Sequence, residues 1–186
     1  MNNIVTSKDA ILQTSRQLIQ QEGWSAIHIR KVAQACGVSV GTLYNYFGNK
    51  SELVAATVES IWCDIFHLPE EQTAFHSFTD CIEWAFSCMH RGDQTYPGFF
   101  SMHSMSFMDA DKAAGQQRMK QSWHHIQDGF CTALLNDPQV DRHVFDEHFT
   151  PQKFVKIIFS LMVAAMIQRD YDPSCVISMV QRILYP

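Results

Sequence analysis

The stretch at residues 32–50, VAQACGVSVGTLYNYFGNK, limits the possible fold of this chain more than any other. Apolar residues at its start and just before it are spaced i, i+3, i+4 and i+7, as in a short amphipathic helix: Ile29, Val32, Ala33 and Cys36. Gly37 follows, and glycine can adopt the left-handed conformation of a tight turn. Ser39 then fits the cap of a second helix. This arrangement predicts a helix-turn-helix, the unit that places a recognition helix in the major groove of DNA.

The second of these predicted helices has two different faces. Its apolar residues are expected to point inward: Val40, Leu43 and Phe47. The outward residues carry no charge, which suits the reading of base edges better than solvation alone: Gly41, Thr42, Asn45 and, at the edge, Tyr44. The alternative is that the polar residues are merely solvated. Both tyrosines cannot face inward together with the apolar residues, so we expect Tyr44 to contact a phosphate and Tyr46 to pack.

A first helix is expected before this unit. Thr6 and Asp9 fit a capping box at its start, and Gly23 fits its end. Its apolar stripe consists of Ile11, Leu12, Leu18 and Ile19. Trp24 comes directly after the glycine, and we expect it to fill the small core from the connecting loop rather than to contact DNA.

The N-terminal third carries the positive charge that DNA would attract. The net charge of the 186 residues is −5. Residues 1–60 hold five Lys and Arg against four Asp and Glu, which gives +1, whereas the remainder holds nine against 15, which gives −6. This asymmetry directs the N-terminal part toward phosphates. Asn49 and Glu52 fit the cap and third residue of a fourth helix, whose first-turn amides would form a phosphate site with Lys50.

Residues 5–53 resemble the DNA-binding domain of the TetR family of bacterial transcriptional regulators. The resemblance is carried by Gly23-Trp24, by IRKVAQACGVS at 29–39, by GTLYNYF at 41–47, and by Lys50 with Leu53. It implies an all-α fold, with an N-terminal three-helix helix-turn-helix domain and a C-terminal helical bundle for ligand binding and dimerisation. It also implies a homodimeric repressor that releases twofold-symmetric operator DNA when a small hydrophobic effector binds. The DNA-binding residues we expect are His28, Ser39, Val40, Gly41, Thr42, Tyr44, Asn45 and Lys50.

His28 departs from the family pattern. Members commonly have Thr at this position, at the start of the second helix, where the hydroxyl caps the helix and contacts a phosphate. The sequence leaves two alternatives open for His28: a side chain that caps or contacts a phosphate, and an exposed side chain that is not engaged.

The C-terminal part is expected to be helical throughout. We place the DNA-binding domain at 1–50 and the ligand-binding and dimerisation domain at 51–186, joined by a helix that begins near residue 51. Further helices are expected at 74–90, ended by Gly92; from Pro97 through FFSMHSMSFM; at 113–135, broken by Asp137-Pro138; at 150–169, begun by Thr150-Pro151; and at 173–184.

A ligand pocket in the C-terminal part is implied by the resemblance. Met and aromatic side chains can line a cavity that adapts to ligands of varied shape, although the same stripes would also serve as an ordinary helical core. The candidate ligand-binding residues are Trp62, Phe66, Phe99, Met102, Met105 and Trp123.

The helix expected at 150–169 is apolar nearly all round and must therefore be covered on every side. One short helix after it is too little cover, so we expect both helices to pair with their twofold mates in a dimer. Such a dimer would hold two recognition helices about 34–36 Å apart. The interface residues we expect are Phe154, Ile158, Leu161, Met162, Ala165, Val176, Val180 and Ile183.

Other kinds of function have less support in the sequence. His124 and Asp128 share a helix face, but two ligands do not make a zinc site, so we expect no metal and no cofactor. The sequence has no nucleophile and base at a spacing that would indicate an enzyme. No membrane span or signal peptide is evident, which indicates a cytoplasmic protein with mostly reduced cysteines. The alternative function is a dimeric helical small-molecule-binding or redox-sensing module with weak or no DNA binding.

Overall fold

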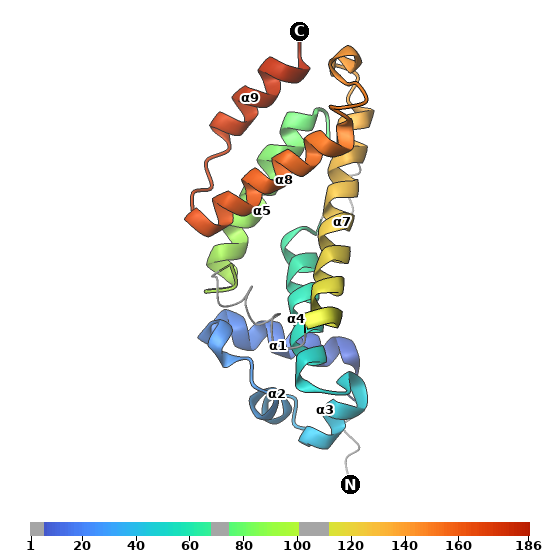
Figure 1. The fold of residues 1–186 in the computed structure, drawn as a ribbon. Coiled ribbons are helices and arrows are strands. Elements are labelled where there is room, and N and C mark those ends of the chain that lie inside the picture. Colours follow the sequence, from blue (N-terminus) through green and yellow to red (C-terminus); the bar gives the residue numbers. More distant parts are fainter. Residues whose placement is uncertain (1–5, 68–74, 101–111) are drawn as a thin grey trace. The chain divides into compact units, whose positions relative to one another are not determined.

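The computed structural model describes residues 6–67, 75–100 and 112–186, with residues 112–122 described by their backbone alone. Every regular element in these ranges is a helix, so the fold is all-α, as predicted (Figure 1). None of these helices combines the length and the apolar character needed to cross a bilayer. The elements are α1 (Lys8–Glu22), η1 (Trp24–Ala26), α2 (Ile29–Ala35), α3 (Val40–Phe47), α4 (Lys50–Ile65), α5 (Phe78–Thr95), α7 (Lys112–Asn136), η3 (Arg142–Val144), α8 (Pro151–Gln168) and α9 (Ser174–Leu184).

The chain divides into two compact units. The first contains Met1–Ile65 and Gly92–Lys120, and the second contains Phe66–Arg91 and Gln121–Pro186. The first unit therefore extends past residue 50, where the sequence analysis places a boundary, and it includes a segment that is distant in sequence.

In the first unit, helices α1 to α4 contact one another around a small apolar core. Figure 1 shows α1, α2 and α3 in blue to cyan, with α4 in teal following α3. The side chains that are at most 2% exposed come from all four helices: Ile11, Ile19, Val32, Leu43, Phe47, Leu53 and Ile61. The apolar spacing in the sequence thus predicts this core, because each stripe is buried against the others.

The start of α1 differs from the prediction. Ser7, not Thr6, caps the helix, since Ser7 Oγ accepts a hydrogen bond from the Ala10 N–H at 3.1 Å. The expected cap by Thr6 is therefore wrong. Gly23 ends α1 as predicted, with φ at 80° and its N–H donating to the Ile19 carbonyl at 2.8 Å.

The turn at residues 96–100 completes the core of the first unit. Trp24 is buried, as predicted, and its ring meets Phe99 edge-on with centroids 5.8 Å apart. The Trp24 N–H donates to the Pro97 carbonyl at 3.1 Å. Tyr96, only 1% exposed, donates its hydroxyl to Asp64 Oδ2 at 2.6 Å. Burial, together with the neighbouring Asp64 carboxylate, raises the pKa of Tyr96, so the tyrosine stays neutral.

Helix α5 lies later in the chain than predicted, from residue 78 to residue 95. Its start is set by Ser77 and Asp80, which exchange hydrogen bonds: the Asp80 N–H donates to Ser77 Oγ, and the Ser77 N–H donates to Asp80 Oδ2, both at 3.1 Å. The prediction that Gly92 ends this helix is wrong. Gly92 lies within α5, and its missing side chain leaves room for Ile65, whose Cδ1 would lie 2.8 Å from a Cβ at this position.

The second unit contains α8 and α9, which end and begin almost where the sequence predicts. Thr150 Oγ1 accepts from the Lys153 N–H at 3.2 Å, Pro151 occupies the first turn, and Arg169 ends α8 with φ at 56°. In the core, the Phe78 ring lies 6.2 Å from Phe130 and 6.3 Å from Phe154. Local capping signals thus fix these helices, and aromatic contacts join α5, α7 and α8.

Candidate nucleic-acid interface

The turn between α2 and α3 has the geometry that the sequence predicts. Gly37 has φ at 67°, in the left-handed region, and its N–H donates to the Gln34 carbonyl at 3.1 Å. Ser39 Oγ accepts from the Thr42 N–H at 3.1 Å and lies 2.9 Å from Thr42 Oγ1. The start of α3 is therefore held by its own side chains, and both hydroxyls are engaged within the cap.

The two faces of α3 differ as predicted. Leu43 and Phe47 are buried at 0% and 2% exposure, whereas Gly41, Tyr44 and Asn45 are exposed. Thr42 is half-buried. Val40, which the sequence analysis expects on the inward face and also among the DNA-binding residues, is half-buried as well. The exposed face consequently offers a backbone, a phenol and an amide, without any charge.

Tyr46 is not packed in the core, so that expectation is wrong. Its side chain is 41% exposed, about as much as that of Tyr44 at 40%. The Tyr46 hydroxyl donates to the Thr6 carbonyl at 2.6 Å and so ties α3 to the residue before α1. The helix has too few inward positions for both Tyr46 and its apolar residues, and a hydrogen bond holds the ring at the surface instead.

The fold itself does not require glycine at position 41. Gly41 is helical, without a positive φ, and a Cβ added there would lie 3.6 Å from Ser39 Oγ, which is ordinary van der Waals contact. Glycine within a helix costs roughly 0.5–1 kcal/mol relative to alanine. The fold would therefore accept a side chain at this exposed position.

The start of α4 forms the edge of the same surface. Asn49 Oδ1 accepts from the Glu52 N–H at 2.9 Å, which confirms the predicted cap. Lys50 is the first residue of α4 and is exposed. The capped start of α4 and the ammonium group of Lys50 thus come directly after α3 in the chain.

His28 occupies the N-cap position of α2 but makes no side-chain cap hydrogen bond there. Its side chain is exposed. The capping alternative for His28 is therefore wrong, because the imidazole does not replace the hydroxyl that the family pattern has at this place. The phosphate contact remains a prediction.

Two exposed basic residues of the first unit are absent from the predicted DNA-binding residues. The Lys8 ammonium lies 5.6 Å from the centroid of the Phe47 ring, and Arg30 is exposed on α2. Lys31 is different, because it forms an ion pair with Glu22. Lysine and arginine at the first turns of α1 and α2 are the signal that could have identified Lys8 and Arg30 as phosphate contacts.

The sequence of this region matches a known family. Residues 11–57 match the family described as bacterial regulatory proteins, tetR family. The N-terminal region is of the TetR family. The HTH-type transcriptional regulator AlkX of Mycobacterium tuberculosis is 41% identical over 46 residues, a match that covers 25% of this chain and 22% of AlkX. The family and this relative are transcriptional regulators rather than enzymes.

Solved structures of TetR-family proteins share the fold over nearly the whole chain. A TetR-family transcriptional regulator from Rhodococcus sp. has a TM-score of 0.66 at 17% identity, covering 95% of this chain and 97% of its own. The regulator FadR from Bacillus subtilis, in complex with stearoyl-CoA, has a TM-score of 0.59 at 17% identity, covering 92% and 94%. At these identities the likeness shows that the fold is TetR-like.

The predicted ligand-binding residues form two groups. In the first unit, Trp62 and Phe99 are 6% and 3% exposed, and their rings lie 5.5 Å apart. In the second unit, the Phe66 ring lies 6.0 Å from Trp84, and the Trp123 ring lies 5.4 Å from Phe159. Trp123 Nε1 is buried and has no hydrogen-bond acceptor among the described residues. The remaining two candidates, Met102 and Met105, lie outside the described residues.

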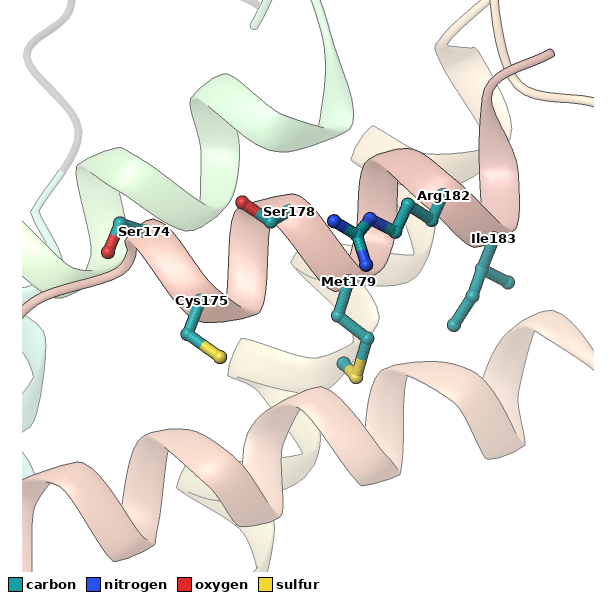
Figure 2. Close-up of a pocket in the computed structure, with 6 residues that line it drawn as sticks. All are labelled: Ser174, Cys175, Ser178, Met179, Arg182 and Ile183. Atoms are coloured by element: carbon teal, nitrogen blue, oxygen red, sulfur yellow. The ribbon is translucent and has the colours of Figure 1, made fainter.

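A groove of about 540 Å³ follows one side of α9 (Figure 2), and Ile183 is the one lining residue that is also predicted for the dimer interface. In Figure 2, Cys175, Met179 and Ile183 point to one side of the helix. The lining is Ser174, Cys175, Ser178, Met179, Arg182 and Ile183. A surface of this kind, lined by one helix, is open to a partner rather than enclosed.

The residues predicted for the dimer interface divide into core and surface. Four of them are at most 2% exposed within the single chain and have no surface left for a partner: Phe154, Ile158, Met162 and Val180. Leu161 is 36% exposed, and Ala165, Val176 and Ile183 are half-buried. Ile157 and Ile167, which the prediction left out, are 48% and 50% exposed. An apolar stripe on a helix does not reveal which part of it the chain's own core takes.

Four of the six cysteines lack the low pKa that a redox sensor needs. All six are free thiols. Burial raises the pKa of Cys81 to about 12, and it also raises the pKa of Cys63, Cys88 and Cys131. Redox sensors need accessible thiolates of low pKa. Among the described residues, no group of three His, Cys, Asp or Glu side chains could hold a metal ion.

Proposed function

We propose that this chain is a cytoplasmic transcriptional repressor that binds a twofold-symmetric operator as a homodimer through α3 and releases it when a small hydrophobic effector binds. The observation that carries the DNA-binding part is the exposed face of α3. That face is uncharged, starts at a capped helix end and includes a glycine that the fold does not need. A bare helix backbone allows close approach to a ligand, and the major groove admits a helix.

Replacement of Gly41 by alanine tests this proposal, because its effects on folding and on DNA binding should have opposite signs. The added methyl group should raise the free energy of unfolding by roughly 0.5–1 kcal/mol, since helical glycine is costly. The same group would stand between α3 and the DNA, and we expect a loss of operator affinity on the order of tenfold or more, about 1.4 kcal/mol. Urea unfolding and fluorescence anisotropy, with a duplex enriched by the wild-type protein from a random library, measure the two effects.

Gly129 provides the matched control. It is an exposed glycine within α7, and a Cβ added there would meet nothing within 4 Å. Gly129→Ala should therefore stabilise the protein like Gly41→Ala and leave duplex affinity unchanged. Equal duplex affinity of wild type and both variants would contradict the proposed role of α3.

Apolar surface on α8 and α9 supports the homodimer. Ile157, Leu161 and Ile167 are each at least 36% exposed on α8, and the groove on α9 adds Cys175 and Met179. Ile157 and Leu161 are four residues apart and share a face of α8, and an exposed apolar patch of this kind indicates a surface that another protein covers. A second copy of the chain can cover it with the same residues, because a twofold interface is self-complementary.

An effector with a long apolar chain is the proposed signal. The FadR of Bacillus subtilis, which shares the fold, binds stearoyl-CoA in its structure. In this chain, Trp123 supports a ligand within the second unit, because its buried Nε1 lacks an acceptor among the described residues. A buried donor left unsatisfied costs about 1–3 kcal/mol, which a polar atom of a ligand would recover.

A further inference from the structure

The chemistry of the exposed face of α3 also limits which base pairs the proposed operator complex can read, and this inference rests on the proposed function. In a helix-turn-helix, the second helix contacts base edges while the first crosses the backbone. The exposed basic residues of this region, Lys8, Arg30 and Lys50, all lie outside α3. We therefore expect them to contact phosphates, which leaves base reading to α3.

Two side chains of α3 remain available for hydrogen bonds to DNA: the Tyr44 phenol, which we expect at a phosphate, and the Asn45 amide. The Thr42 hydroxyl lies 2.9 Å from Ser39 Oγ and is engaged in the cap. The Tyr46 hydroxyl donates to the Thr6 carbonyl. The Asn45 side chain is exposed, and no hydrogen bond of its amide to any described residue is present. Asn45 is thus the one carboxamide on this face, and its planar amide group carries both a hydrogen-bond donor and an acceptor.

Base pairs differ in the hydrogen-bond donors and acceptors that they present to an amide in the major groove. Guanine presents two acceptors in the major groove, O6 and N7, and arginine or lysine is their usual partner. Adenine presents the N6 donor beside the N7 acceptor, which pairs with the two ends of an asparagine amide. Residues 40–47 contain no arginine or lysine.

We propose that each α3 reads an A·T base pair through Asn45, whose amide donates to adenine N7 and accepts from adenine N6, and that α3 makes no comparable contact with guanine. The operator half-site should therefore contain an adenine at one defined position, while guanine N7 atoms contribute little to recognition. This assigns Asn45 as the residue that determines specificity.

The test removes single acceptor atoms from the DNA. Duplexes are first enriched by the wild-type protein from a randomised library, and each adenine or guanine is then replaced by its 7-deaza analogue. With wild-type protein, 7-deazaadenine at one position of each half-site should weaken binding by about tenfold, because one bond of the bidentate pair is lost. No 7-deazaguanine should weaken it by more than about twofold.

Protein variants identify the partner of that adenine. Asn45→Ala should bind the unmodified duplex more weakly and should no longer distinguish adenine from 7-deazaadenine. Gln17→Ala, which removes an exposed amide from α1, should behave like the wild type. Thermal unfolding of both variants should match the wild type, since both side chains are exposed.

The possible failures are distinguishable. Enrichment of a sequence whose binding depends on guanine N7, or an Asn45→Ala variant that still detects the adenine change, overturns this inference and leaves the proposed function standing. Failure to enrich any sequence overturns the proposed function, and the inference with it.

Discussion

At the scale of single residues, Asp137 holds the second unit together. Its side chain is 3% exposed and accepts three hydrogen bonds: from the Tyr185 hydroxyl at 2.6 Å, from the Phe78 N–H at 2.7 Å and from the Gln139 N–H at 2.9 Å. One carboxylate thereby joins the start of α5, the turn after α7 and the residue after α9. A buried carboxylate is stable only with such partners.

The hydrogen bonds of Asp137 also determine how stability depends on pH. Burial by itself raises the pKa of Asp137, but the bonds from Tyr185, Phe78 and Gln139, with the nearby charge of Arg142, lower it below its ordinary value. An aspartate has a pKa of about 3.9 in an unfolded chain. The stabilisation is therefore present above about pH 3.9 and is lost as the pH falls through the lower folded pKa.

The variant Asp137→Asn should test this contribution. An asparagine turns one acceptor into a donor that faces other donors, so we expect the free energy of unfolding at pH 7 to fall by about 1–3 kcal/mol. The difference from wild type, measured by urea unfolding, should shrink as the pH approaches 3 and below. Asp128→Asn, at an exposed position on α7, should show no such effect. A difference that stays constant from pH 7 to pH 3 would contradict the assigned role.

At the scale of elements, local signals predict some helix ends and contacts distant in sequence decide others. Ser39, Asn49 and Thr150 cap helices where the sequence predicts, because a cap bonds only within its own first turn. Gly92 shows the limit of such reasoning. It looks like a helix end, but it serves as the place where Ile65 packs against α5. Only the folded chain brings α4 and α5 together.

The faces of helices show the same division. The inward face of α3 could be predicted for Leu43 and Phe47 but not for Tyr46, which a hydrogen bond to Thr6 holds at the surface. The faces of α8 could not be predicted, because α8 is apolar nearly all round and its spacing does not distinguish Ile158, in the core, from Ile157, at the surface. The candidate ligand-binding residues fall into two groups for a related reason. They share a residue type, and residue type alone does not show that Trp62 and Trp123 belong to different units.

The contact between α7 and α8 gives a prediction about the effector. Stearoyl-CoA, the ligand in the FadR complex, should raise the melting temperature of the wild-type protein, since a ligand that binds only the folded state stabilises it by about 2.7 kcal/mol at 100 times its Kd. Trp123→Phe removes the buried Nε1 and keeps a ring against Phe159, so the ligand-induced rise should be smaller. An equal rise in both proteins would exclude Trp123, and no rise in wild type would exclude this acyl ligand.

At the scale of the whole molecule, α1 to α3 belong to a compact unit that extends beyond the helix-turn-helix. The unit takes in α4 and residues 92–120, where Pro97 and Phe99 contact Trp24. No periodicity in the sequence reveals such a contact, because the two segments are more than 70 residues apart. The family resemblance predicts the helix-turn-helix, but the contacts of Trp24 with Pro97 and Phe99 are seen only in the folded chain.

The proposed dimer determines how many chains one operator binds. Leu161 is 36% exposed on α8, so Leu161→Glu should leave the single chain folded and place a charge in the proposed interface. Leu135→Glu is the control, because Leu135 is 43% exposed on α7, outside that interface. A buried unpaired charge is costly enough to separate the two copies.

Sedimentation velocity of the protein mixed with its enriched duplex tests the central claim most directly. We expect two wild-type chains on each duplex. Leu161→Glu should sediment as a single chain that no longer binds the duplex at the same concentration, and Leu135→Glu should behave like the wild type. A wild-type protein that binds its duplex as one chain, or a Leu161→Glu variant that binds as a pair, would contradict the account.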